Sequence, residues 1–203
     1  TRQRHGAPRL GELALARLAL ALGRDAGRQS GSQTLARVNA ELAKTYGEGQ
    51  WALSISALGI LLNKALIGER KVNARALAED VRRLLLAEPG IAVAYTRADL
   101  ESGSRRQEPF FDAMRKSWNP ERSADVQFAL KPWWMMTSST SVTTHGSPHP
   151  YDTHVPLLFY GPKWVDAGRS DRKAEVADIA PTLARLLRIP PPAASEGKPL
   201  PLN

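Results

Sequence analysis

The sequence contains no cysteine, which excludes disulfide bridges and thiolate metal sites. It also lacks an uninterrupted apolar run of the roughly 18 residues that a membrane helix needs, because Glu12 and Arg17 break the apolar stretch at 10–22. We therefore predict no membrane span. No signal peptide is visible in the opening TRQRHG, so we expect either that export is absent or that the front of the protein is not shown.

Aromatic residues are scarce, at 6%, whereas positive charge is in excess, with a formal net charge of +8. The Arg and Lys residues are dispersed along the chain and are not interleaved with aromatics, as a nucleic-acid stacking surface would require. We therefore do not expect nucleic-acid binding. A length of 203 residues with 42% hydrophobic content suffices for one substantial core and is short for two.

Hydrophobic periodicity predicts alternating helices and strands. The predicted helices are 10–23, 33–46, 74–88 and a short one at 109–117, and the predicted strands are 51–58, 91–96, 125–130 and 155–160. Asn73 is a good N-cap for the third helix. The apolar run at 155–160 predicts a continuous, fully buried strand. This alternation favours an α/β sandwich, with functional residues on loops at strand ends.

A last helix is predicted in VADIAPTLARLLRIPPP. Asp178 is expected to cap it by accepting hydrogen bonds from the N–H groups of the first turn. Leu183, Leu186 and Leu187 are expected to form its buried stripe, and the prolines from Pro190 stop it.

Chemistry concentrates in the segment 143–162, TTHGSPHPYDTHVPLLFYGP, where three histidines and an aspartate adjoin the predicted strand. His145 precedes a glycine in a compact polar turn, which suits either a metal ligand or an ordinary loop histidine. His154 could be a second ligand, a group that orients a ligand, or a buried histidine bonded to backbone. Asp152 can orient an imidazole or cap a turn. His149, between two prolines, is predicted to be exposed.

Three segments together carry a family resemblance: HGSPHPYDTHVPLLFYGP, VADIAPTLARLLRIPPP and SEGKPL. They resemble the C-terminal end of the alkaline phosphatase superfamily, specifically the type I phosphodiesterase/nucleotide pyrophosphatase-like alkaline phosphatases. The resemblance is strongest over 117–203, which includes NPERSADVQFALKPWW, and upstream it persists as an order of elements.

The resemblance implies an alkaline-phosphatase-like α/β sandwich with a mostly parallel central sheet and helices on both faces. Residues 1–203 would be the C-terminal part of a single domain. Within it, 1–50 would be a helical lead-in and 51–203 the sheet-forming portion that carries the HGSP motif.

The resemblance also implies a two-zinc hydrolase, in which three aspartates and three histidines hold the metals and a Thr or Ser attacks phosphorus. His145 matches the histidine of the HG motif that completes one zinc site. His154 follows at a position that is not a primary ligand, and with Asp152 it is a candidate for supporting the site. The nucleophile belongs to the family's N-terminal half, which this chain does not contain.

The other ligands do not carry over. If the family's Asp-His-Gly turn falls on Ala57-Leu58-Gly59, neither aliphatic side chain can donate electrons to zinc. A competing placement at Asp25-Ala26-Gly27 keeps the aspartate and loses the histidine. Thr1 and His5 stand where the family has a DxxxH pattern. The metal candidates are therefore His145, with His5 and Asp25 as further ones.

Three hypotheses follow. The leading one is a degenerate or partial domain that is inactive on its own, because one good ligand and two further candidates fall short of two zinc sites. The second is an active metal-dependent phosphomonoesterase or phosphodiesterase completed by an N-terminal segment or a second chain. The third is a non-catalytic module that binds a phosphoryl ligand or a protein. The resemblance implies a phosphate-ester substrate and a periplasmic or secreted location.

Overall fold

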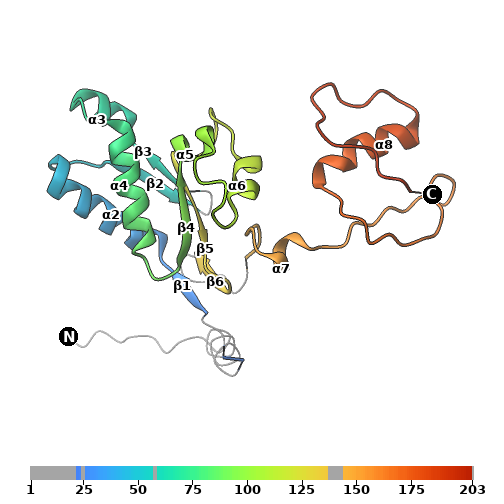
Figure 1. Ribbon diagram of the computed structural model, residues 1–203, viewed down its shortest axis with the longest axis horizontal. Helices are drawn as coiled ribbons and strands as arrows, with labels where there is room; N and C mark the ends of the chain where they lie inside the picture. The colour runs from blue at the N-terminus through green and yellow to red at the C-terminus, as the bar shows by residue number, and fades with distance from the viewer. Residues whose placement is uncertain (1–21, 24–25, 57–58, 137–143, 203) are drawn as a thin grey trace, which may run out of the picture. The chain divides into compact units, whose positions relative to one another are not determined.

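The computed structural model describes residues 22–23, 26–56, 59–136 and 144–202. The chain divides into two compact units, Thr1–His154 and Val155–Asn203 (Figure 1). Within the described ranges, no helix has the length and apolar character needed to cross a membrane. The predicted organisation, as the C-terminal part of a single domain, stays a prediction.

The N-terminal unit is a mixed α/β structure, which confirms the predicted α/β class (Figure 1). Its elements are β1 (Gly27–Gln29), α2 (Gly31–Tyr46), β2 (Ala52–Ser56), β3 (Gly59–Leu62), α3 (Lys64–Glu69), α4 (Ala74–Leu86), β4 (Ile91–Thr96), α5 (Arg97–Ser102), α6 (Phe111–Ser117), β5 (Val126–Leu130), β6 (Trp134–Met136) and α7 (Pro150–Thr153). The four predicted elements at 33–46, 74–88, 91–96 and 125–130 appear as α2, α4, β4 and β5. The predicted helix 10–23 lies almost wholly outside the described residues.

Two sheets are present among the described residues. The larger has the strand order β2-β3-β5-β4, and each neighbouring pair in it is antiparallel. The smaller pairs β1 with β6 in parallel. The expectation of a mostly parallel sheet thus holds for the β1–β6 pair and not for the four-stranded sheet. One reason is local: β2 and β3 follow each other too closely for the crossover that parallel strands require.

Gly59 is the first residue of β3, and its Cα faces the backbone of β5. Its φ is +125°, and a Cβ atom built there would lie 2.3 Å from the carbonyl oxygen of Val126 and 2.8 Å from Cβ of Ala124. A side chain at this position would therefore clash with backbone as well as occupy a strained conformation.

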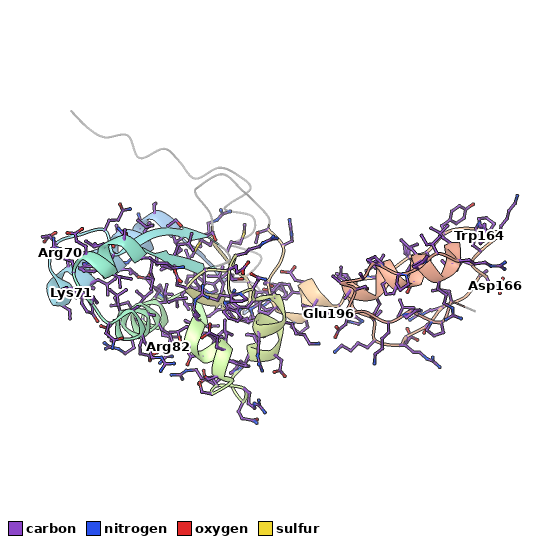
Figure 2. All side chains as sticks on the ribbon, turned by 90° about the horizontal axis from the view of Figure 1, so that it is seen from above. Arg70, Lys71, Arg82, Trp164, Asp166 and Glu196 are labelled. Atoms are coloured by element: carbon purple, nitrogen blue, oxygen red, sulfur yellow. The ribbon has the colours of Figure 1, made fainter. Side chains whose placement is uncertain are left out.

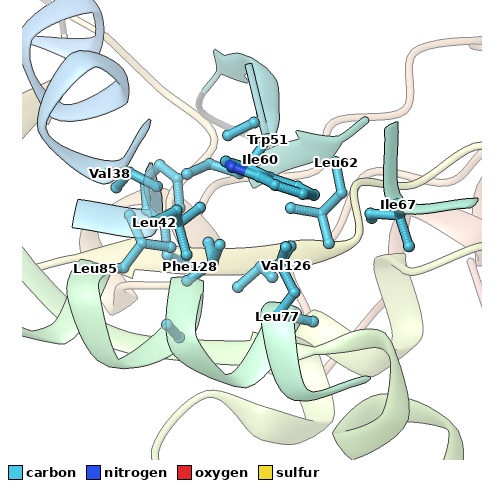
Figure 3. Packing of buried hydrophobic residues seen from close by; sticks show 14 of the residues in the cluster. Val38, Leu42, Trp51, Ile60, Leu62, Ile67, Leu77, Leu85, Val126 and Phe128 are labelled. Atoms are coloured by element: carbon cyan, nitrogen blue, oxygen red, sulfur yellow. The ribbon is translucent and has the colours of Figure 1, made fainter. Parts of the chain in front are cut away.

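Helices cover both faces of the four-stranded sheet, as predicted. On one face, α2 and α4 enclose the larger apolar cluster (Figure 3). The members labelled there are Val38, Leu42, Trp51, Ile60, Leu62, Ile67, Leu77, Leu85, Val126 and Phe128. On the other face, α5 and α6 help to bury a smaller cluster of Val93, Tyr95, Leu100, Phe111, Met114 and Ala129. The sheet is therefore the middle layer of three.

An irregularity in β4 explains why Ile91 and Val93, two residues apart, belong to different clusters. Its register with β5 shifts between Ile91 and Val93. Ile91 and Ala94 belong to the larger cluster, whereas Val93 and Tyr95 belong to the smaller one. Without the shift, Ile91 and Val93 would share a face, because side chains alternate along a strand.

Polar side chains cap α4 and join the two helices of this face to β1 of the smaller sheet. Asn73 caps α4 as predicted, and its side chain accepts hydrogen bonds from the N–H groups of Arg75 and Ala76. The buried carboxylate of Glu88, just after α4, accepts from Arg37 Nε at 2.8 Å and Nη2 at 2.6 Å, and also from Gln29. This network joins β1, α2 and the end of α4.

The C-terminal unit contains a short 3₁₀ helix, η1 (Val176–Asp178), followed by α8 (Ile179–Leu187). The Asp178 carboxylate accepts from the N–H groups of Glu175 and Lys198, each at 2.8 Å. It therefore caps the 3₁₀ turn and holds the C-terminal segment, whereas we expected it to cap the first turn of α8. A Cβ at Gly197 would lie 2.0 Å from the carbonyl oxygen of Ala177, so this close return requires glycine.

Two predictions for this unit are wrong. The run 155–160 is not a strand, and Val155, Leu158 and Tyr160 are 62%, 86% and 94% exposed. A continuous apolar strand is buried only between two covering layers, and the described residues of this unit supply no strand to pair with it. Leu183 and Leu187 are likewise exposed, and α8 instead buries Pro181, Thr182 and Ala184.

Candidate functional site

His145 lies in the loop that leads to α7, and its side chain is exposed. Gly146 follows with a φ of +89°, so the chain turns sharply immediately after the histidine. This places the imidazole at the surface of the N-terminal unit. The assignment of His145 as a metal ligand stays a prediction.

Asp152 closes the turn next to His145. Its carboxylate accepts hydrogen bonds from the backbone N–H of Ser147 at 2.8 Å and from the Ser147 hydroxyl at 2.5 Å. These two bonds hold the pKa of Asp152 below its usual range, with a smaller contribution from nearby His145. Of the two roles expected for Asp152, the structure shows turn capping.

His149 is buried, so the prediction that it is exposed is wrong. Only 4% of its surface is accessible, and Nε2 lies 2.8 Å from the carbonyl oxygen of Leu130. Because a carbonyl can only accept, Nε2 must carry a proton. His149 thereby fastens the start of α7 to the end of β5. The flanking prolines indicated a loop but carried no information about packing against residues distant in sequence.

Four aromatic rings form a ladder in the order Phe110, His149, Tyr151 and Trp133. Successive ring centroids are 4.8, 5.3 and 4.6 Å apart, and the last two contacts are stacked. The Tyr151 hydroxyl also accepts a hydrogen bond from the backbone N–H of Trp133 at 3.2 Å. Phe110 and Trp133, at the two ends, have φ values of +62° and +67°. Left-handed backbone at such residues costs about 1–3 kcal/mol each, which the surrounding contacts must offset.

His154 is exposed, which rules out the buried alternative for this histidine. Its backbone N–H donates to the Pro150 carbonyl at 2.8 Å and closes α7. The other two metal candidates, His5 and Asp25, lie outside the described residues, as do Ala57 and Leu58 of the predicted Asp-His-Gly position.

Asp125 is a buried polar residue that the sequence did not single out. Its carboxylate accepts from the Leu62 N–H at 2.9 Å, and the cationic groups of Lys64 and Arg97 lie 3.5 and 3.6 Å away. The Arg97 guanidinium also lies 5.6 Å from the ring centre of Trp118. Each residue comes from a different element, so no sequence spacing could have indicated the cluster.

The described donors near His145 fall short of a zinc site. Structural and catalytic zinc sites need three or four good donors. Throughout 26–56, 59–136 and 144–202, no group of three or more His, Asp or Glu side chains could hold a metal ion. The Asp152 oxygen beside His145 is engaged by Ser147. The described part of the chain therefore does not form a zinc site by itself.

No protein-family model matches the chain. Among curated proteins, alkaline phosphatase PafA of Elizabethkingia meningoseptica is 27% identical over 164 residues, which cover 80% of this chain and 30% of PafA. A calcium-transporting ATPase of Myroides odoratus is 29% identical over 167 residues, with the same two coverages. Alkaline phosphatase PhoV of Synechococcus elongatus is 42% identical over 82 residues, or 40% of this chain and 14% of PhoV.

The crystal structure of wild-type PafA is similar to this chain with a TM-score of 0.80 and 25% identity, over 90% of this chain and 34% of that one. This likeness confirms the alkaline-phosphatase-like fold. The chain also spans only about a third of the length of PafA.

Proposed function

Because the chain belongs to the alkaline phosphatase superfamily, we propose that it is a part of a phosphate-ester hydrolase domain whose metal-ligand set is incomplete, and that it is inactive on its own. The observation that carries the proposal is the isolation of His145. This residue is exposed, and the described residues around it supply no cluster of three donors. The sequence adds that both placements of the family's Asp-His-Gly turn lose ligands: Ala57-Leu58 would replace the aspartate and the histidine, and Asp25-Ala26 would replace the histidine alone.

Metal content and turnover of the purified chain test the proposal. We expect zinc well below one ion per chain after dialysis against zinc, and no hydrolysis of p-nitrophenyl phosphate above the buffer rate. The matched control is His145→Ala, which should leave both readings unchanged. Stoichiometric zinc together with robust turnover that His145→Ala abolishes would overturn the proposal.

A second candidate is an active phosphomonoesterase or phosphodiesterase that includes this chain as its C-terminal portion. The observation that favours it is length: the matched segment covers 30% of PafA, and the remainder of such a protein could supply the nucleophile and further ligands. In that case the resemblance implies two zinc ions and a periplasmic or secreted location. His145→Ala in the assembled protein should then abolish metal-dependent activity, and an unchanged rate would exclude the second candidate.

A further inference from the structure

Two arginine side chains meet at the C-terminal end of α5. Arg106 lies in the loop that follows this helix, and Arg115 lies in the last turn of α6. Arg106 Nη2 and Arg115 Nη1 lie 3.3 and 3.7 Å from the position that a Cβ atom would take at Gly103. Both arginines are exposed, whereas Gly103 is buried. The two guanidinium groups therefore share one small region of the surface.

The positive charges of this pair are not neutralised by the protein around them. The adjacent Arg105 is bound by the carboxylates of Asp99 at 2.9 Å and Glu108 at 2.7 Å. Within the described residues, the guanidinium of neither Arg106 nor Arg115 makes an ion pair or a hydrogen bond, not even with the carbonyl groups that end α5. Two like charges held close together repel each other, so an anion that bridges them is bound favourably.

We propose that Arg106 and Arg115 together bind the phosphoryl group of a small anion, either free phosphate or a phosphate monoester. A phosphoryl group carries close to two negative charges at neutral pH and has three or more acceptor oxygens, so it can bond two guanidinium groups at once. A carboxylate has one charge and two oxygens, which a single guanidinium satisfies in a bidentate pair. The inference goes beyond the proposed function and does not depend on it, because it uses neither a metal nor the turn at His145.

The backbone holds both arginines in place. The N–H of Arg106 donates to the Gly103 carbonyl at 3.3 Å, which closes a turn directly after α5. On the other side, α6 is anchored by Phe111 and Met114, which are both buried, and Arg115 follows Met114 in the chain. The backbone of the site is thus ordered before a ligand arrives, which lowers the conformational entropy lost on binding.

Titration with inorganic phosphate tests the inference. The purified, nitrogen-15-labelled chain is followed by NMR through its arginine Nε–H signals, and calorimetry gives the affinity. We expect saturable binding that shifts the signals of Arg106 and Arg115. Arg106→Gln and Arg115→Gln should each weaken binding by about three- to tenfold, because each removes exposed charge-assisted hydrogen bonds, and the double variant should abolish it.

A matched control removes a cation elsewhere in the same unit. Lys71 is exposed in the turn between α3 and α4, away from α5 and α6 (Figure 2). Lys71→Asn lowers the net charge by as much as either arginine variant, and asparagine tolerates the φ of +54° at this position. Binding of phosphate to Lys71→Asn should stay within about twofold of the parent chain, because one distant surface charge contributes little.

Two further ligands define the chemical class that binds. Glycerol phosphate is compared with inorganic phosphate, and the tighter of the two assigns the site to the monoester or to the free anion. We expect acetate to bind about tenfold more weakly than either. Absence of phosphate binding, equal binding of acetate, or binding that the double variant leaves intact in folded protein would overturn the inference. None of these outcomes decides the proposed function, which zinc content and turnover test separately.

Discussion

The two units bury apolar side chains to very different degrees. In the N-terminal unit a sheet lies between helices, and Trp51, Tyr95 and Phe111 are almost completely buried. In the C-terminal unit a single α-helix and its loops leave Leu158, Tyr160 and Trp164 largely exposed. The difference teaches that apolar composition alone does not produce a core. A run of apolar residues is buried only when other elements cover it on both sides.

The largest expected effect comes from truncating matching tryptophans in the two units. Trp51 is fully buried, and its indole N–H donates to the Gly47 carbonyl at 2.9 Å. Trp51→Ala should lower the free energy of unfolding of the N-terminal unit by about 3–5 kcal/mol, because it leaves a cavity. Trp164→Ala should change the free energy of unfolding of the C-terminal unit by less than about 0.5 kcal/mol, because Trp164 is exposed. Urea unfolding followed by circular dichroism measures both, and equal losses would remove the contrast between the units.

A smaller effect is expected from the Glu88 network, which only the N-terminal unit contains. The hydrogen bonds from Arg37 hold the pKa of Glu88 below its usual value of about 4.3. A carboxylate with a depressed folded pKa stabilises the protein above its unfolded pKa, and this contribution disappears as pH falls through the folded pKa. Glu88→Gln should therefore cost about 1.5–3 kcal/mol at neutral pH.

The same variant predicts how stability depends on pH. The difference in unfolding free energy between the parent chain and Glu88→Gln should begin to shrink as pH falls below about 4, where Glu88 takes up a proton in the unfolded chain. It should close once pH falls below the depressed folded pKa, where Glu88 is neutral in the folded protein as well. Urea unfolding at a series of pH values gives this difference. A gap that stays constant down to acid pH would mean that the charge of Glu88 contributes nothing and that the lost contacts are purely steric.

The smallest effect is expected in the C-terminal unit. The N–H groups of Lys198 and Glu175 hold the pKa of the half-buried Asp178 below its usual range. Asp178→Asn weakens both hydrogen bonds, so the amide protons of Glu175 and Lys198 should exchange a few-fold faster in hydrogen-exchange NMR. Amides of β4 should keep their rates. If the β4 amides also accelerate, the two units do not unfold independently.

Local signals in the sequence predicted the fold well where one element determines its own structure. Asn73 predicted the start of α4, and the strand predicted at 91–96 has the observed bounds of β4. Prediction failed where burial depends on a neighbour distant in the chain. The run 155–160 has the composition of a buried strand, but no described strand pairs with it.

The candidate site shows the same limit. Turn capping by Asp152 is one of the two roles that its residue type predicts, because aspartate caps turns through its own short side chain. The burial of His149 was not, since it depends on Phe110 and Leu130, which are far away in sequence. The ladder brings together Phe110, Trp133 and the pair at 149 and 151, which are separated in sequence, so no local pattern indicated it.

Gly59 bears on how such a chain can change by mutation. The residue is required because any side chain would collide with the backbone of β5, and this requirement does not involve metal or substrate. One of the two placements of the family's Asp-His-Gly turn puts its aspartate and histidine immediately before this glycine, where this chain has Ala57 and Leu58. A glycine at position 59 is therefore no sign of activity, because the folding of the sheet alone requires it.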